Sequence, residues 1–247
     1  MQWRVIPVEI NLPRMNMALD ESCIEHVAKG YPPTIRFYDY SNNAAIIGYF
    51  QRMQEEVDID FCASNEIDLV RRITGGGAMY LDKEGAITYS VIAPENLLPK
   101  GIHECYKEVS QWVINAFKKF GINAEFRPIN DIVISNKKVS GSALTKKKNV
   151  VMIHGTILHS LNLENMFKVL KVPWEKISDK RIKSVEERVT SILHHKNVSK
   201  KEVYRHLAES FVDGKNFNIG KWTMEEMDRA RYLMENKYKK EEWLFER

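Results

Sequence analysis

The sequence of residues 131–160 is DIVISNKKVSGSALTKKKNVVMIHGTILHS, and it carries the strongest signal for the fold class. Three stretches within it are rich in β-branched and other apolar residues, which is typical of strands. The predicted strands are Asp131–Ser135, Val139–Leu144 and Val150–Ser160. The connectors between them are short and polar, so the sequence predicts a meander of three neighbouring strands.

Elements on both sides of the meander complete the prediction. Upstream strands are predicted at Gln2–Glu9, Thr34–Tyr40, Ala44–Tyr49, Asp68–Ile73 and Ala86–Ala93. Helices are predicted at Met15–Lys29, Asp58–Asn65, Ile102–Phe120, Leu163–Leu170, Val185–Leu193, Ser199–Val212 and Thr223–Tyr238. The predicted fold class is α+β, with a mixed, mostly antiparallel sheet packed with helices. Asp213–Lys221 is linker-like, so we expect a main domain over residues 1–212 and a helical C-terminal extension over residues 213–247.

Composition limits the class of protein. The chain has 247 residues, of which 44% are hydrophobic and 28% charged, which excludes a disordered chain and a disulfide-held miniprotein. The net charge of +4 is too small to indicate nucleic-acid binding. The three cysteines, Cys23, Cys62 and Cys105, lie far apart and form no CxxC pair. With no signal peptide expected and no 18-residue apolar run, we expect a cytoplasmic protein without a membrane span.

A glycine loop follows one of the predicted strands. Arg71-Arg72-Ile73-Thr74-Gly75-Gly76-Gly77-Ala78 places two cations, a hydroxyl group and three glycines in succession. Glycines let backbone N–H groups converge on an anion, and arginines offer planar donors to a carboxylate or phosphate. A tightly packed turn is the alternative explanation of such a run. The loop is neither a Walker loop nor a GxGxxG motif, so anion binding and the turn both stay open.

The predicted meander brings further polar residues together. Asn130 and Asp131 begin one strand, and Lys138 precedes Val139-Ser140-Gly141-Ser142-Ala143 on the next. A lysine beside small residues can hold an oxyanion or an acyl carbonyl, although a hairpin with a solvated lysine is the more common situation. His154 and Thr156 fall on one face of the third strand, because side chains alternate. No set of residues has metal-ligand spacing, so no metal site is predicted.

Read in order, these segments resemble the lipoate–protein ligase A family, within the wider biotin/lipoate ligase superfamily. The resemblance covers most of residues 14–195. It rests on Asn16-Met17-Ala18-Leu19-Asp20-Glu21, Ile47-Gly48-Tyr49-Phe50-Gln51, Arg71–Ala78, Asn130-Asp131 with Lys138–Ala143, and His154-Gly155-Thr156. The combination is specific, although each motif alone is weak. The resemblance implies a biotin/lipoate ligase-like catalytic domain over residues 1–212.

The resemblance also implies a two-step reaction. Lipoate and ATP with Mg²⁺ give lipoyl-AMP and pyrophosphate, and the lipoyl group then passes to a lysine of an acceptor lipoyl domain. By this resemblance Lys138 is the catalytic residue that bridges acyl carbonyl and phosphate oxygens. Substrate and nucleotide binding are assigned to Arg72, Thr74, Gly75, Gly76, Gly77, Ala78, Asn130, Asp131, Gly141, Ala143, His154, Gly155 and Thr156. The implied acceptors are 2-oxoacid dehydrogenase E2 subunits and the glycine cleavage H protein.

The sequence departs from the family pattern at several places. Tyr49-Phe50 stands where the family usually has Arg-Asn, and Leu81-Asp82 where it often has His-Asp. Many relatives carry a small C-terminal domain needed for adenylation, whereas only residues 213–247 follow the core here. We therefore expect the large half of a split ligase, with a small accessory ligase subunit as partner.

Two other functions compete with the ligase. Octanoyl or lipoyl transferases that act from a carrier protein form a thioester on a cysteine. In one group of such relatives the cysteine follows the segment that matches His154-Gly155, and in another it comes just before the hairpin that contains the lysine matching Lys138. The corresponding residues here, 161–173 and 125–134, contain no cysteine. A protein that binds lipoate or an adenylate without catalysis is the other alternative, and Lys138 argues against it. A biotin ligase is disfavoured, because its GRGRxG-type loop is absent.

Overall fold

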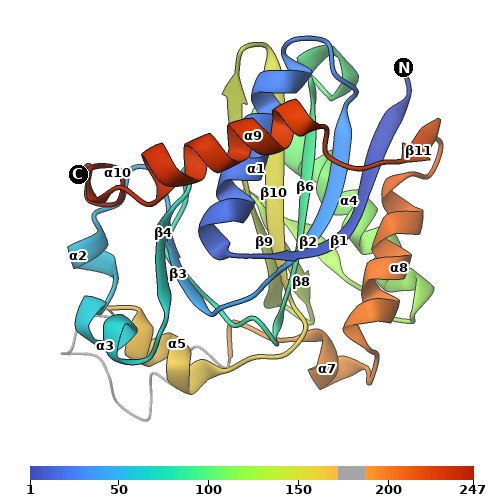
Figure 1. The fold of residues 1–247 in the computed structure, drawn as a ribbon. Coiled ribbons are helices and arrows are strands. Elements are labelled where there is room, and N and C mark those ends of the chain that lie inside the picture. The colour runs from blue at the N-terminus through green and yellow to red at the C-terminus, as the bar shows by residue number, and fades with distance from the viewer. Residues whose placement is uncertain (172–186) are drawn as a thin grey trace.

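The computed structural model describes residues 1–171 and 187–247 and is built around an eight-stranded sheet (Figure 1). The strand order is β11-β1-β2-β6-β10-β9-β8-β7. The bounds are β1 (Trp3–Asn11), β2 (Thr34–Tyr40), β6 (Ala86–Pro94), β7 (Glu125–Arg127), β8 (Asp131–Ile134), β9 (Lys137–Lys147), β10 (Val150–Leu158) and β11 (Phe217–Ile219). Along the part β2-β6-β10-β9-β8 of this order, each strand pairs antiparallel with the next. Strand β1 pairs parallel with β2 and with β11. The mixed, mostly antiparallel α+β fold is confirmed.

A three-stranded sheet and several helices complete the fold. The small sheet has the order β4 (Asp68–Arg71), β3 (Ala44–Ile47), β5 (Met79–Leu81). The helices are α1 (Pro13–Val27), α2 (Met53–Glu56), α3 (Ile59–Ser64), α4 (Ile102–Lys119), α5 (Leu163–Val169), α7 (Ile192–His195), α8 (Lys200–Phe211), α9 (Met224–Leu233) and α10 (Glu241–Leu244). A 3₁₀ turn follows β6 at Glu95–Leu97, and a π-helical turn, Met234–Tyr238, continues α9. Among the described residues, no helix has the length and apolar character needed to cross a membrane.

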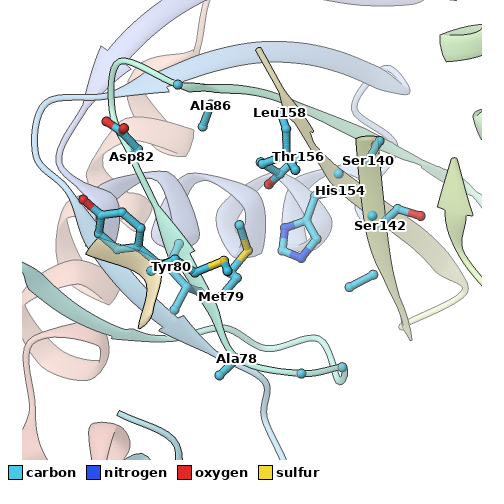
Figure 2. A pocket seen from close by; sticks show the side chains of 18 of the residues that line it. Ala78, Met79, Tyr80, Asp82, Ala86, Ser140, Ser142, His154, Thr156 and Leu158 are labelled. Atoms are coloured by element: carbon cyan, nitrogen blue, oxygen red, sulfur yellow. The ribbon is translucent and has the colours of Figure 1, made fainter. Parts of the chain in front are cut away.

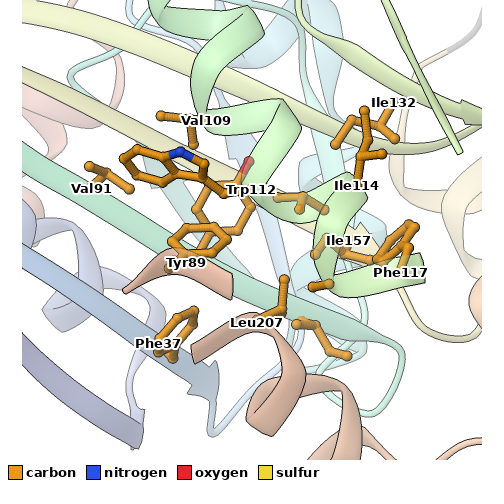
Figure 3. Packing of buried hydrophobic residues seen from close by; sticks show 14 of the residues in the cluster. Phe37, Tyr89, Val91, Val109, Trp112, Ile114, Phe117, Ile132, Ile157 and Leu207 are labelled. Atoms are coloured by element: carbon orange, nitrogen blue, oxygen red, sulfur yellow. The ribbon is translucent and has the colours of Figure 1, made fainter. Parts of the chain in front are cut away.

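One face of the large sheet forms the main hydrophobic core. Alternation along the strands sends Phe37, Val91 and Ile153 to this face, where α4 and α8 cover them (Figure 3). Trp112 of α4 and Phe211 of α8 meet there with their ring centroids 5.5 Å apart. The opposite face packs against α1 and carries the polar side chains of the same strands.

The C-terminal segment packs on the α1 side of the molecule, where α9 lies along α1 (Figure 1). Arg4 of β1 donates to both carboxylate oxygens of Glu226, at 2.6 and 2.5 Å. Arg229 pairs with Glu25 of α1 at 2.6 Å, and Lys237 pairs with Glu21 at 2.7 Å. One buried and two partly buried ion pairs, with the shared apolar cluster of α1 and α9, therefore join residues 213–247 to the rest of the fold.

Several predicted elements need correction. The linker-like stretch at residues 213–221 contains β11, which the sequence did not indicate because all three of its residues are exposed. The predicted helix Val185–Leu193 is wrong over residues 187–191, its last two residues are helical, and its residues 185–186 lie outside the described part. Lys138 N–H donates to the Arg188 carbonyl at 2.7 Å, and Thr190 N–H donates to the Lys138 carbonyl at 2.8 Å. This pairing with β9 satisfies the backbone there, and the helix α7 begins at Ile192.

Candidate functional site

A cavity of about 390 Å³ opens between β9 and β10 of the large sheet, β5 of the small sheet, and α5. In Figure 2, His154 and Thr156 of β10 lie on the side of the cavity opposite Met79 and Tyr80 of β5. Most residues predicted for the site line this cavity, namely Arg72, Gly76, Gly77, Ala78, Asn130, Lys138, Gly141, Ala143, His154, Gly155 and Thr156. Segments that are far apart in the sequence thus meet at one place.

A β-bulge brings Lys138 onto the cavity face. In the pairing of β8 with β9, Val133 is opposite Lys138 but Ile132 is opposite Ser140, so Val139 is the extra residue. The shift puts Lys138, Gly141 and Asp131 on one face of the sheet. Lys138 Nζ lies 2.6 Å from Asp131 Oδ1, and a Cβ at Gly141 would come within 2.9 Å of Lys138 Nζ. Gly141 therefore leaves the room that the lysine side chain occupies.

Asp131 does not line the cavity, and the structure places it behind the lysine. Its Oδ1 is buried, and its partner is the Lys138 ammonium group at 2.6 Å. Asn130 binds the neighbouring strand, because its amide donates to the Ser142 carbonyl and the Ser142 hydroxyl donates to the Asn130 carbonyl at 3.3 Å. These contacts fix the entry of β8 beside β9.

Arg72 is buried beneath the glycine loop and binds two of its carbonyl groups. Its guanidinium donates to the carbonyls of Gly75 at 2.8 Å and Gly77 at 2.9 Å, and it is buried. Burial lowers the pKa of Arg72 to about 10, and the group still carries its charge near neutral pH. Gly76 has φ +97°, and a Cβ there would lie 2.8 Å from the Arg72 guanidinium. Glycine is required at this position both for its backbone conformation and for the close approach.

The backbone amides of the same loop differ from its carbonyls in their partners. In the described part of the chain, the N–H groups of Gly75, Gly76 and Gly77 have no acceptor, while Arg72 binds the carbonyls of Gly75 and Gly77. Two of these glycines, Gly76 and Gly77, line the cavity. An array of unpaired N–H groups beside a buried guanidinium is suited to an oxyanion. Gly75 does not line the cavity and packs near the ring of Phe50.

Arg71 points away from the cavity and joins two other segments, a role that the sequence did not reveal. It donates to the carbonyls of Tyr49 and Gln51, each at 2.7 Å, and to the Leu244 carbonyl of α10 at 3.0 Å. The turn at Gly48 in turn touches the glycine loop, since a Cβ at Gly48 would come within 3.1 Å of Gly75 C. The C-terminal helix α10 is thus connected to the loop through Arg71 and this turn.

Thr74 is fully buried and does not line the cavity, contrary to a direct contact with a ligand. Its hydroxyl lies 2.8 Å from His154 Nε2, and His154 Nδ1 lies 3.2 Å from Asp20 of α1. Burial alone would raise the pKa of Asp20, but the Arg36 guanidinium and hydrogen bonds from His154 and Ser90 hold it below its ordinary value. Asp20 is therefore a carboxylate at neutral pH.

The apolar part of the cavity was not predicted from the sequence. Its walls there come from β5, α5 and the strands around them. The residues are Met17, Tyr38, Tyr40, Ile46, Met79, Tyr80, Met166 and Leu170. Asp82, one of the two residues at the departure from the family pattern, also lines the cavity, whereas Tyr49 and Phe50 are not among the lining residues. Tyr49 lies beside the C-terminus instead, where the Arg247 guanidinium is 4.9 Å from the Tyr49 ring centroid.

None of the three cysteines lines the cavity. All are buried, and burial raises the pKa of Cys23 to about 12 and that of Cys62 to about 11. The pKa of Cys105 is also raised by burial. A thiol needs the opposite shift to act as a nucleophile near neutral pH.

Residues 12–212 match the lipoyl protein ligase A/B catalytic domain, and the chain belongs to this family. The resemblance drawn from the five ordered motifs is thereby confirmed. No cluster of three metal-ligating side chains occurs among residues 1–171 and 187–247.

Solved structures and curated proteins of two kinds are similar to the chain. A chain from a bipartite lipoate protein ligase of Thermoplasma acidophilum, studied with its E2 lipoyl domain, is 34% identical with a TM-score of 0.91, covering 99% of this chain and 96% of that one. A lipoate-protein ligase A bound with ATP is 32% identical with a TM-score of 0.86, covering 99% of each. The octanoyltransferase LipM of Geobacillus kaustophilus is 30% identical, covering 99% of this chain and 98% of its own.

Proposed function

We propose that the protein is a lipoate–protein ligase that activates lipoate with ATP to lipoyl-AMP and transfers the lipoyl group to a lysine of an acceptor lipoyl domain. One observation carries the proposal: the unpaired amides of Gly76 and Gly77 share a cavity with the Lys138 ammonium group. Both are suited to negative charge, which an acyl phosphate presents and which grows in the transition states of both steps. The similarity to an ATP-bound ligase supports ATP as the nucleotide of the activation step.

The cavity has a part for each portion of the intermediate. Apolar side chains of Met79, Met166 and Leu170 suit the hydrocarbon chain and the dithiolane ring of lipoate. Gly76, Gly77 and Arg72 would hold the phosphate, and Lys138 would lie between that phosphate and the acyl carbonyl. Asn130, Gly141 and Ala143 would border the adenylate, with Asp131 acting through Lys138, and Gly155 and Thr156 would line the floor.

Asp131 bears on ATP-Mg²⁺, because a carboxylate oxygen is the type of ligand that Mg²⁺ accepts. Its Oδ1 is paired with the Lys138 ammonium group at 2.6 Å, so it would have to leave this ion pair to bind the metal. Mg²⁺ carried by ATP would screen the phosphate charge during activation. The protein's own part is to orient the lipoate carboxylate, to hold the phosphate at the loop and to keep water out of the apolar end.

In the transfer step, the acceptor lysine attacks the acyl carbonyl as a free amine. The bond between the carbonyl carbon and the phosphate oxygen breaks, AMP leaves with that electron pair, and the amine loses a proton to give the amide. Lys138 stabilises the negative charge on the carbonyl oxygen and on the leaving phosphate. No cysteine is required for this chemistry.

The proposed partners are lipoyl-domain proteins, E2 subunits of 2-oxoacid dehydrogenases and the glycine cleavage H protein, together with a small accessory ligase subunit. The similarity to the bipartite T. acidophilum ligase and its E2 lipoyl domain supports the acceptor and the accessory subunit. The accessory subunit would serve chiefly the activation step, because activation requires ATP and a carboxylate to be held in line.

Octanoyl transfer from a carrier protein is the second candidate, and the similarity to octanoyltransferase LipM favours it. That reaction requires a cysteine thiolate as the acyl acceptor on the enzyme. The buried positions and raised pKa values of Cys23, Cys62 and Cys105 argue against it.

ATP–pyrophosphate exchange with lipoate tests the proposal, alongside transfer from synthetic lipoyl-AMP to a lipoyl domain. We expect transfer from lipoyl-AMP by the chain alone, and lipoate-dependent exchange when the second subunit of the T. acidophilum ligase is added. Full exchange without that subunit would remove the accessory subunit from the proposal. Failure to transfer from lipoyl-AMP would contradict the ligase itself.

A further inference from the structure

A chain of buried polar groups runs from the glycine loop to the helix behind the sheet. Thr74 Oγ1 lies 2.8 Å from His154 Nε2, and His154 Nδ1 lies 3.2 Å from Asp20 Oδ2. Asp20 Oδ1 accepts from Arg36 at 3.0 Å. Thr74 and Arg36 are 0% exposed, and Asp20 is 1% exposed. The chain therefore crosses the interior from β10 to α1 without contact with solvent, except at the cavity edge of His154.

The contacts determine which nitrogen of His154 carries a proton. A carboxylate only accepts hydrogen bonds, so the ring nitrogen that faces Asp20 must be the donor. In the neutral ring, Nε2 then accepts, and the Thr74 hydroxyl donates to it. Ser90 donates to the same Asp20 oxygen at 2.9 Å, which keeps that oxygen in place toward the ring.

Stability alone does not account for a charged pair at this position. The attraction between buried ions is largely offset by their loss of hydration, so apolar packing would hold α1 to the sheet equally well. The other face of the same strands shows this apolar solution, with Phe37 and Val91 in place of Arg36 and Ser90. The carboxylate is instead placed where it can act on His154.

We propose that Asp20 is a positioning residue, which fixes the Nδ1–H form of His154 and, through His154 and Thr74, anchors the start of the glycine loop. Arg72 holds the carbonyls of Gly75 and Gly77 at the other end of the loop. The loop is thus held at both ends, with its amides directed to neither anchor. The effect of Asp20 on activity rests on the proposed ligase reaction, whereas its effect on His154 and the loop does not.

Asp20→Asn tests the proposal with little change of shape. With its oxygen kept toward Arg36, the new amide turns an N–H toward His154, and Nδ1 must then accept. Nε2 becomes the protonated nitrogen and donates to Thr74, which reverses the direction of the chain. A wrong histidine tautomer of this origin is costly in the Ser-His-Asp triad.

The first measurement is ¹⁵N NMR of histidine-labelled protein, with His154 assigned by its loss in His154→Gln. We expect Nδ1–H in the wild type and Nε2–H in Asp20→Asn. Hydrogen exchange at the Tyr49 amide, which donates to the Thr74 carbonyl at 2.8 Å, should become faster in the variant, and this rate is the measure of loop exchange. Transfer from lipoyl-AMP should fall about tenfold or more, the effect of roughly one lost hydrogen bond. Asp228→Asn, an exposed residue paired with Arg231, is the matched control.

Thr74 provides a second test that does not require Asp20→Asn to fold. Thr74→Val removes the hydroxyl at constant shape and should speed exchange of the loop, whereas Thr74→Ser should restore the wild-type rate. In the double variant Asp20→Asn with Thr74→Val, the effects should fail to add, because both interrupt one chain. An unchanged His154 tautomer in Asp20→Asn, or equal loop exchange in Thr74→Val and Thr74→Ser, would overturn the proposal. A wild type inactive with lipoyl-AMP would count against the ligase, while the NMR and exchange results would still decide the role of Asp20.

Discussion

The two faces of the large sheet come from the same strands but differ in chemistry. Toward α4 and α8, Phe37, Val91 and Ile153 form an apolar core (Figure 3). Toward α1, their sequence neighbours Arg36, Ser90 and His154 form hydrogen bonds and ion pairs with Asp20. The first face serves stability, and the second directs polar groups toward the cavity.

Substitutions at neighbouring positions of one strand should therefore have different consequences, depending on the face of the sheet that they change. A change on the apolar face removes dispersion contacts and hydrophobic burial, so it should alter the free energy of unfolding. A change on the polar face should alter the reaction, because few of its contacts are needed for packing. Lys138→Ala on the polar face and Ile153→Val on the apolar face test this division.

The largest effect is expected for Lys138→Ala. Loss of a donor to developing negative charge typically lowers the rate by about 10²–10³. Because the Lys138 side chain is 43% exposed, the thermal unfolding of the variant should stay close to wild type. The measurement is single-turnover transfer from lipoyl-AMP to a lipoyl domain.

Lys146→Ala is the control for Lys138, since Lys146 lies on the same strand and contacts Glu95 at 3.8 Å, away from the cavity. It should transfer at the wild-type rate. Near-normal turnover by Lys138→Ala would remove Lys138 from the mechanism and would weaken the functional division between the faces.

Arg71→Lys should have the next largest effect. A lysine cannot reproduce the planar set of donors that joins Tyr49, Gln51 and Leu244, so buried carbonyls lose their partners. We expect a loss of about 2 kcal/mol in stability, together with faster exchange of the Tyr49 amide, which donates to the Thr74 carbonyl of the loop. Chemical denaturation and hydrogen exchange measure the two effects.

The control for Arg71 is Arg231→Lys, whose side chain is 61% exposed in a pair with Asp228. It should change neither quantity. If Arg71→Lys lowered stability but left loop exchange at the wild-type rate, α10 would have no influence on the glycine loop.

Ile153→Val tests the apolar face next to His154. Removal of one buried methyl group should cost about 0.5–1.5 kcal/mol in the free energy of unfolding. The rate of transfer per folded molecule should be unchanged. A substantial loss of kcat in Ile153→Val, measured under conditions in which the variant is fully folded, would show that the two faces are not independent.

Much of this organisation was predictable from local sequence. Alternation along Val150–Ser160 correctly placed His154 and Thr156 on one face, and the short connectors correctly predicted the meander of β8, β9 and β10. Thr223 and Glu226, three residues apart, form a capping box at the start of α9, a spacing that is visible in the sequence. These features depend on residues within a few positions of one another, so the sequence contains the relevant information.

The features that were missed depend on distant contacts or on a break in alternation. The bulge at Val139 shifts the register by one residue, and no local pattern indicates it. Strand β11 exists because it pairs with β1, more than 200 residues earlier in the chain. Arg71 and Arg72 are adjacent in sequence, yet one binds the C-terminal helix and the other the glycine loop. Asp20 and His154 meet only through the packing of α1 on the sheet.

The smallest effect on the rate is expected for the cysteine-free variant. Octanoyl transfer through an enzyme thioester would instead make this effect the largest. The variant Cys23→Ala, Cys62→Ala, Cys105→Ala lacks every thiol of the chain. None of the three lines the cavity, so a folded variant should retain the wild-type rate of transfer from lipoyl-AMP. Circular dichroism would establish that the variant is folded before its activity is compared.

A comparison of two acyl donors tests the central claim most directly. Wild-type and cysteine-free protein are each given lipoyl-AMP or an octanoyl carrier protein, and both the acceptor lipoyl domain and the enzyme are weighed by intact mass spectrometry. The ligase predicts acylation of the domain from lipoyl-AMP by both proteins, with no covalent acyl group on the enzyme. Acylation of the domain from the octanoyl carrier, with a thioester on the wild-type enzyme and no activity in the cysteine-free one, would contradict it.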